Sequence, residues 1–244
     1  MTMDFTLDKY KELLEALDRC EKVMLRHDVD LRPLNSLATA RIERELGWKA
    51  VYYFRVKPES FDEAVILQIA SLGHEIGYHY ESLATCNGDM EAAYRDFCSN
   101  LERLRALAPV STISMHGSPT SKWDSRDLWK HYDYRRLGVV SEPYLDTDFS
   151  QVFYLTDTGR RWDGFRVSVR DKIPEYQDQW IKKGWSYHST DDIIQAINRG
   201  GFPAQVMVNT HPQRWTDNRY LWLKELLLQS AKNVVKRHVV RNNL

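Results

Sequence analysis

The sequence predicts an α/β fold, a distorted (β/α) barrel with about seven parallel strands that forms one domain over residues 1–244. Short apolar runs rich in β-branched and aromatic residues alternate with amphipathic stretches, which is the pattern of strand–helix units. The length of 244 residues suits one such barrel. Nearly every apolar run ends in an ionisable residue, and a barrel brings the last residues of all its strands to one face.

The strands are expected in eight short runs, KVML, KAVYYFR, HEIGYHY, VSTISM, LGVVSE, QVFYLT, FRVSV and AQVMVNT. The segment around 145–170 predicts a β-hairpin, inserted in the barrel wall or laid over its mouth. No glycine-rich phosphate loop such as GxGxxG follows the first run, which disfavours a nucleotide-binding open sheet.

The stretches between these runs carry helix signals. Residues 34–46 have helical spacing and stop at Gly47, and the stretch after Asp62 stops at Gly73. A longer helix is expected within residues 88–109, and STDDIIQAINRGG begins with a capping residue and ends in glycine.

Composition limits the classes of partner. Lys plus Arg and Asp plus Glu are both 34, so no global field attracts nucleic acid or an anionic membrane. The N-terminal stretch has no apolar core typical of a signal peptide, and no run reaches the ~18 apolar residues of a membrane span. The three cysteines have no close metal-binding spacing. We therefore expect reduced thiols in a cytoplasmic protein without a nucleic acid or membrane partner.

The stretch VMLRHDVDLRPLN places two carboxylates directly after a short apolar run. If that run is a strand, alternation puts Asp28 and Asp30 on one face. Two like charges at this distance repel, so the fold gains from a cation between them or from an acid that must stand near another group. The alternative is a solvated loop in which Asp30 caps a helix that begins near Pro33.

Histidines near other strand ends extend this pattern. His79 lies within a strand, His116 precedes a turn at a strand end, and His211 precedes Pro212. Two Asp and several His at one barrel mouth predict a divalent metal site with an open position. Such ligands suit Zn²⁺ first, and also Co²⁺, Ni²⁺, Mn²⁺ or Fe²⁺. His74 is expected to bridge a helix end and a strand, and His27 is a candidate to hold Asp28.

Three motifs, RHDVD, GHEIGYH and NTHP, occur in this order between residues 25 and 212. In this combination the chain resembles the polysaccharide deacetylases of carbohydrate esterase family four, which have a distorted barrel of seven strands. Carried over by position, the resemblance implies Asp28 as general base, Asp30 and His79 as metal ligands, and His211 as general acid.

The chain departs from that family pattern in two places. Leu83 stands where the family usually has a second metal-binding His. We expect His116 as the third ligand, with Glu81 as the runner-up because it points the same way as His79 on an extended segment. The family's Arg-Pro-aromatic motif is missing, so the arginine that orients the base has three candidates, Arg26, Arg55 and Arg161.

The resemblance implies a metal-dependent hydrolase that removes an N-acetyl or O-acetyl group from a sugar or related small substrate, either a small molecule or an oligosaccharide. The residues expected to contact it are Arg55, Glu81, Trp123 and Arg161, and further tryptophans that could stack on a sugar ring are Trp129, Trp162 and Trp215. Two alternatives remain: a non-catalytic or degenerate carbohydrate-binding barrel, and a hydrolase of cyclic amides or ureides.

Overall fold

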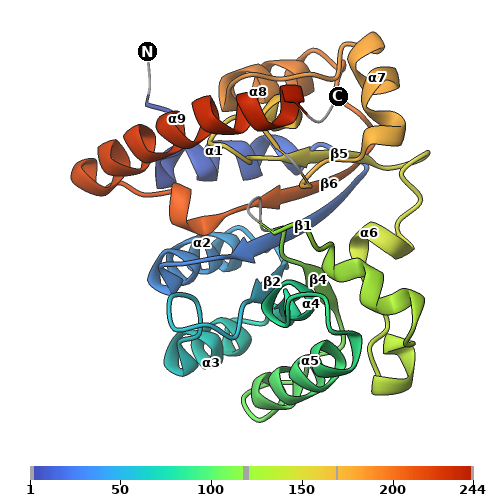
Figure 1. Cartoon of the computed structure of the whole chain (residues 1–244). Coiled ribbons are helices and arrows are strands. Elements are labelled where there is room, and N and C mark those ends of the chain that lie inside the picture. Colours follow the sequence, from blue (N-terminus) through green and yellow to red (C-terminus); the bar gives the residue numbers. More distant parts are fainter. Residues whose placement is uncertain (1–2, 118–120, 169, 243–244) are drawn as a thin grey trace.

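The computed structural model describes residues 3–117, 121–168 and 170–242, with side chains described as far as residue 234. Its centre is one curled sheet of six strands in the order β4-β3-β2-β1-β6-β5, and every adjacent pair is parallel. The strands are β1 (Lys22–Val29), β2 (Val51–Phe54), β3 (Glu75–Tyr80), β4 (Ile113–Met115), β5 (Phe153–Thr156) and β6 (Gln205–Thr210). The predicted α/β class with a distorted, barrel-like sheet is confirmed (Figure 1).

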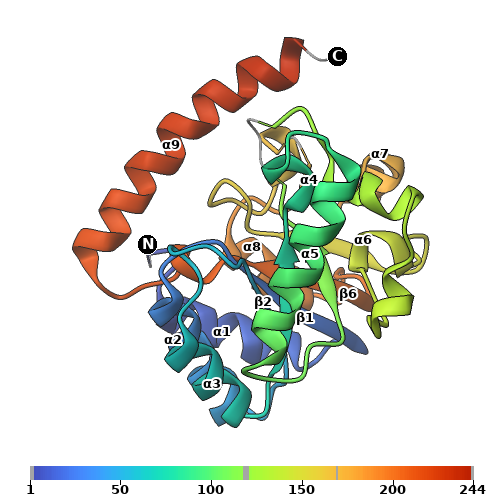
Figure 2. The ribbon, with the colours of Figure 1, turned by 60° about the horizontal axis from the view of Figure 1, so that its bottom comes forward.

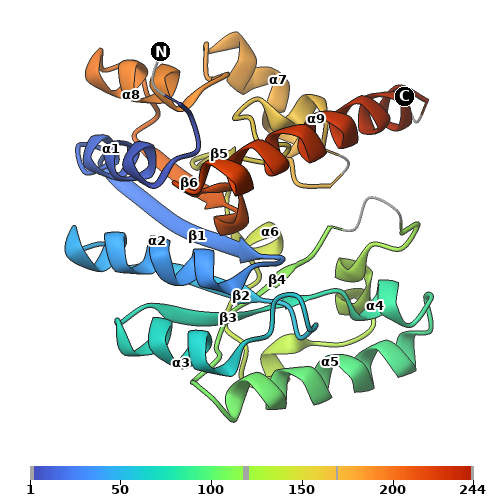
Figure 3. The ribbon, with the colours of Figure 1, turned by 90° about the vertical axis from the view of Figure 1, so that its left-hand side faces the viewer.

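Helices follow most of the strands and cover the outside of the sheet. Figure 3 shows α2, α3 and α5 along one part of it, with α1 and α8 packed together beside β1 and β6. The helices are α1 (Leu7–Leu17), α2 (Pro33–Glu45), α3 (Glu63–Ser71), α4 (Ser82–Thr85), α5 (Met90–Arg105), α6 (Pro143–Asp146), α7 (Pro174–Lys182), α8 (Thr190–Asn198) and α9 (Arg219–Asn242). Figure 2 shows α9 as a long helix at the outside of the molecule.

The helix starts follow the capping signals of the sequence. The Asp62 and Asp89 side chains accept hydrogen bonds from the backbone amides of Val65 and Ala92, which lie in the first turns of α3 and α5. Ser189 starts α8 with a reciprocal capping box. In contrast, Asp30 does not cap α2, because Arg32 is the capping position and makes no side-chain cap bond. The alternative interpretation of Asp30 as a helix cap is therefore wrong.

The middle of the chain differs from the prediction. The described part of residues 145–170 holds no hairpin: its one strand, β5, pairs in parallel with β6 from Phe153↔Val206 to Thr156↔Asn209. FRVSV begins in a 3₁₀ turn, and LGVVSE supplies only an isolated bridge between Thr112 and Ser141. The described sheet thus has six strands, and β4 and β5 are its two edges. A β-rich run becomes a strand only where a neighbour offers an open edge, which local composition does not report.

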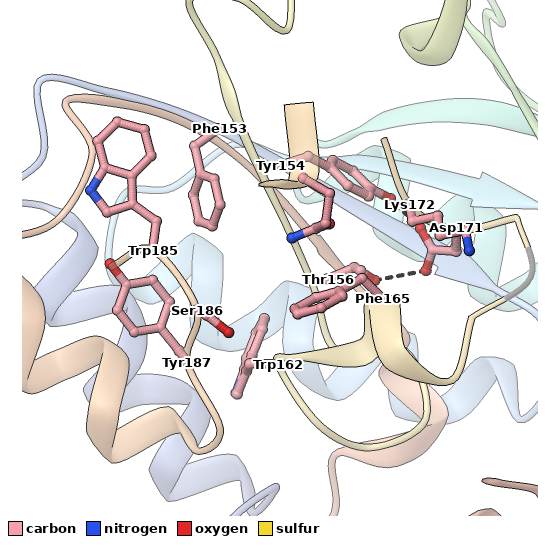
Figure 4. A pocket seen from close by; sticks show the side chains of 11 residues that line it. Phe153, Tyr154, Thr156, Trp162, Phe165, Asp171, Lys172, Trp185, Ser186 and Tyr187 are labelled. Atoms are coloured by element: carbon pink, nitrogen blue, oxygen red, sulfur yellow. Dashed lines mark hydrogen bonds between the residues drawn. The ribbon is translucent and has the colours of Figure 1, made fainter. Parts of the chain in front are cut away.

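Two of the tryptophans considered for sugar stacking belong to the core. Trp162 is 4% exposed and Trp215 is fully buried. Trp162 faces a cavity of only about 20 Å³ beside β5, which it shares with Phe153, Trp185 and Tyr187 (Figure 4). That space holds about one water molecule, so a sugar ring does not fit against Trp162 there, and Trp215 has no exposed face on which one could stack.

Alternation along β1 sends neighbouring side chains to opposite sides of the sheet. His27 turns toward the helices, where its Nε2 lies 2.8 Å from Glu43 of α2 and its Nδ1 lies 2.6 Å from the Thr210 hydroxyl. The suggestion that His27 holds Asp28 is therefore wrong, because the two side chains leave opposite faces. His74 has the expected structural contacts, with Nε2 2.9 Å from the carbonyl oxygen of Ala40 in α2.

The three cysteines are free thiols, Cys20, Cys86 and Cys98. Within the described ranges, no helix combines the length and apolar character needed to cross a bilayer.

Candidate active site

A cavity of about 570 Å³ lies where the strands of the sheet end. The five residues predicted to act in catalysis or metal binding all line it, namely Asp28, Asp30, His79, His116 and His211. They come from β1, β3, β4 and β6 or from the residues that follow them, and the carboxyl ends of parallel strands share one edge of the sheet. Two carboxylates at the end of β1 and three histidines from elsewhere in the chain therefore meet at one cavity.

Asp30, His79 and His116 form a cluster whose potential ligand atoms all lie within 4.8 Å of one another. The Oδ1 atom of Asp30 is 3.5 Å from Nε2 of His79 and 3.4 Å from Nε2 of His116. This buried oxygen has no hydrogen-bond partner among the described residues, which is costly unless another group satisfies it. One carboxylate and two imidazoles are a donor set that suits a divalent transition metal, so the residues present fit such an ion.

The Nδ1 atoms of both imidazoles have hydrogen-bond partners. Nδ1 of His79 is 2.9 Å from the carbonyl oxygen of Ser114, and Nδ1 of His116 is 2.9 Å from Oε2 of Glu81. A carbonyl oxygen can only accept, so Nδ1 of His79 carries the proton. When the rings are neutral, the lone pair of each is then on Nε2, the nitrogen that lies near Asp30.

Asp28 is held in its charged form beside this cluster. Its Oδ1 accepts from Nη2 of Arg26 at 2.6 Å, and its Oδ2 accepts from the Asn209 side chain at 2.8 Å. Burial alone would raise the pKa of Asp28, but the charges of Arg26, His79 and His211 outweigh it, so the pKa lies below its usual value. Arg26 is thus the arginine that contacts the predicted base.

His211 faces the same cavity and is held from behind by Asp157. Its Nδ1 lies 2.6 Å from Oδ1 of Asp157, while its Nε2 lies 3.9 Å from Oδ2 of Asp30. Asp157 is fully buried and also accepts from Arg214 and from the Trp215 indole N–H. Burial would raise the pKa of Asp157, but the charges of Arg214 and His211 prevail and lower it. A charged carboxylate therefore orients the imidazole with Nε2 toward the cavity.

The four predicted substrate-contact residues lie outside the wall of this cavity. Arg55, Glu81 and Trp123 line an adjacent cavity of about 610 Å³. Arg161 is paired with Asp163, two positions along the chain. Their contact with a substrate stays a prediction, and the structure shows Arg55 and Glu81 paired with one another and in contact with Asp30 and His116.

Three residues of the site were given no role at the site by the sequence reasoning. Asn209 contacts Asp28, Asp157 orients His211, and Gln213 donates to Oδ2 of Asp30 at 3.2 Å. Two of them carried a signal. Asn209 stands two positions before His211 and so shares its side of β6, and Asp157 directly follows an apolar run whose end adjoins β6. Nothing local to Gln213 marks it, because it reaches Asp30 only through the fold.

Comparison with known proteins gives solved structures alone, because no family model and no curated protein matches the chain. PdaA from Bacillus subtilis, described as a family 4 carbohydrate esterase, is 13% identical with a TM-score of 0.39, and the match covers 92% of this chain and 84% of PdaA. A family 4 carbohydrate esterase from Bacillus anthracis is 12% identical with a TM-score of 0.40, over 91% of this chain and 86% of that protein. The peptidoglycan deacetylase PdaC from Bacillus subtilis is 9% identical with a TM-score of 0.40, over 90% and 97%.

Proposed function

We propose that this chain is a metal-dependent hydrolase that removes an acetyl group from the nitrogen or oxygen of a sugar or related small substrate. The observation that supports it is the convergence of three kinds of group on one cavity. These are the cluster of Asp30, His79 and His116, a charged carboxylate at Asp28, and an imidazole at His211. A site that only binds sugar has no need of a proton acceptor and a proton donor on either side of a ligand cluster.

In this proposal Asp28 accepts the proton of the attacking water. Nε2 of His79 lies only 3.9 Å from Oδ2 of Asp28, so the base stands next to the ligand cluster. Arg26 and Asn209 fix the orientation of the carboxylate and keep it ionised. A carboxylate with a lowered pKa is a weak base. A divalent cation held by Asp30, His79 and His116 would polarise the acyl carbonyl and lower the pKa of water.

His211 protonates the leaving nitrogen or oxygen from the other side. Asp157 fixes Nδ1 of His211, so Nε2 is the atom that exchanges a proton with the substrate. Amides gain most from this proton, because an amine anion is a very poor leaving group.

The cavity favours a small substrate or one end of an oligosaccharide. Its volume of about 570 Å³ falls in the range of roughly 300–1,000 Å³ typical of small-molecule sites. The buried residues Glu225 and Gln229 of α9 also line it. We propose that α9 limits how far a polymer can extend across the site.

The test is acetate release from a panel of N-acetylated and O-acetylated sugars with added Zn²⁺ or Co²⁺. Asp28→Asn keeps the shape of the side chain and removes the proton acceptor. A positioned general base contributes about 10²–10⁴-fold to the rate, so the variant should lose turnover by that factor while it still binds metal.

The matched control is Asp148→Asn, an exposed acid on the loop before β5 whose side chain accepts from Ser150. It should leave turnover unchanged. A single low rate shared by the wild type and Asp28→Asn, with equal sugar binding, would instead support the sugar-binding barrel.

A further inference from the structure

The two histidines of the proposed metal centre are oriented in different ways. His79 lies within β3 and pairs in register with Ser114 of β4, so sheet geometry brings the Ser114 carbonyl to its Nδ1. His116 lies one residue past the end of β4, where only its backbone N–H, bonded to the Tyr80 carbonyl at 2.8 Å, continues the pairing. The sheet therefore holds the His116 backbone, and the orientation of its ring depends on a side chain.

That side chain is Glu81, whose two oxygens have separate partners. Oε2 lies 2.9 Å from Nδ1 of His116. Oε1 accepts from Nε and Nη2 of Arg55, at 3.1 and 2.7 Å. Nη1 of the same arginine donates to the backbone carbonyl of Asp30 at 3.2 Å. Arg55 thus contacts both the Glu81 carboxylate and the backbone of Asp30, which also belongs to the proposed metal centre.

Arg55 donates to Oε1 from two nitrogens, so Glu81 meets His116 as the carboxylate of an ion pair. An ionised carboxylate can only accept hydrogen bonds, so Nδ1 of His116 must carry the proton of the neutral ring. The lone pair is then on Nε2, which lies 3.4 Å from Oδ1 of Asp30.

We propose that Glu81 is a positioning residue for metal binding, which sets the tautomer and direction of the His116 ring and is itself fixed by Arg55. The proposal rests on the metal centre of the proposed function. It also accounts for position 83. Leu83 is fully buried in α4, so the ligand comes instead from the end of a different strand and brings its own orienting group.

The test compares Zn²⁺ affinity of the wild type and Glu81→Gln by calorimetry. The glutamine amide has one oxygen where the carboxylate has two, so it cannot accept from both Arg55 and His116. Loss of a carboxylate behind a ligating histidine typically costs about 10–100-fold in metal affinity, and we expect a loss in that range. The visible absorption of bound Co²⁺ should also change, because it reports the ligand geometry that a purely structural role of Glu81 would leave intact.

The control is Glu59→Gln. Glu59 also pairs with Arg55, at 3.1 Å, but its side chain is 49% exposed, and Glu81 rather than Glu59 contacts His116. Its affinity and Co²⁺ spectrum should match the wild type. Equal losses in both variants would overturn the proposal, as would unchanged affinity in Glu81→Gln.

A second variant covers a failure of Glu81→Gln to fold. Arg55→Lys keeps the positive charge but cannot donate from two nitrogens to Oε1, so metal binding should weaken, and unchanged affinity would overturn the proposal. Metal binding by the wild type with no effect of either variant defeats this inference alone. A wild type that binds no metal defeats the proposed function as well.

Discussion

Three carboxylates near the cavity differ in what surrounds them. Asp28 accepts from an arginine and an amide, and Asp157 is surrounded by donors on both oxygens. Asp30 keeps one buried oxygen with no donor. Their environments suit them to different tasks: a charged proton acceptor, an orienting group behind His211, and a metal ligand.

The proposed role of His211 as general acid can be tested by changing the leaving group of the substrate. His211→Ala should lower turnover of N-acetyl sugars by about 10²–10⁴-fold. An activated aryl acetate should lose much less, because its leaving group departs without a proton. The measurement is the ratio of the two rates in wild type and variant. His188→Ala is the control, since His188 is exposed and its ion-pair partner is Asp163, outside the cavity wall. A uniform loss on both substrates would argue against the acid role.

Among the elements, the long connection from β4 to α6 ends in a buried acid that the site does not use. Glu142 is fully buried, caps α6 by accepting from Leu145 N–H at 3.0 Å, and accepts from Met115 N–H at 3.0 Å. Burial raises the pKa of Glu142 from 4.5 to about 7. The folded chain therefore keeps a proton there that the unfolded chain releases at lower pH.

This shift predicts how stability changes with pH. Since the folded state binds the extra proton, the contribution of Glu142 to the free energy of unfolding is largest below pH 4.5 and falls as pH rises through about 7. The size of the fall is on the order of 1–3 kcal/mol. The glutamine of Glu142→Gln stays neutral. In urea unfolding without metal, the free energy of unfolding of the variant should therefore rise relative to that of the wild type between pH 5 and pH 8.

The comparison needs an exposed acid as its control. Glu102→Gln removes a carboxylate that is 71% exposed and pairs with Arg105. The free energy of unfolding of this variant should change with pH in the same way as that of the wild type. If the curve of Glu142→Gln also ran parallel, the proton would not be held at Glu142.

For the whole molecule, the proposed metal centre joins segments that are distant in sequence. Its residues follow β1, lie in β3 and follow β4. Anything that binds only the folded chain stabilises it, by about 2.7 kcal/mol at a ligand concentration of 100 times Kd. For a chain of this length each kcal/mol raises Tm by about 2–4 °C.

We therefore expect Zn²⁺ or Co²⁺ to raise Tm by roughly 5–10 °C over the chelator-treated protein. Asp30→Ala should abolish this shift, because it removes the carboxylate that faces both histidines. Asp28→Asn should keep it, since Asp28 is outside the ligand cluster. Differential scanning calorimetry gives the values. A full shift in Asp30→Ala would remove Asp30 from the ligand set.

Much of the candidate site could be predicted because its acidic residues and histidines lie at or near strand ends. The spacing of Asp28 and Asp30 placed both on one side of β1, and His79, His116 and His211 were each assigned to the end region of a strand. Parallel strands then bring such positions together without further information. Contacts such as Gln213 to Asp30 could not be predicted in this way, since they join loops whose paths depend on packing.

The sequence by itself determined the alternation of short strands with helices and the capped starts of α3 and α8, because hydrophobic period and capping act over a few residues. Only the tertiary structure decided that the described part of residues 145–170 adds one parallel strand rather than a hairpin. It alone decided that Arg26, and not Arg55 or Arg161, contacts Asp28. Strand partners and ion pairs are chosen by which edges and charges meet after folding, over separations that no local pattern spans.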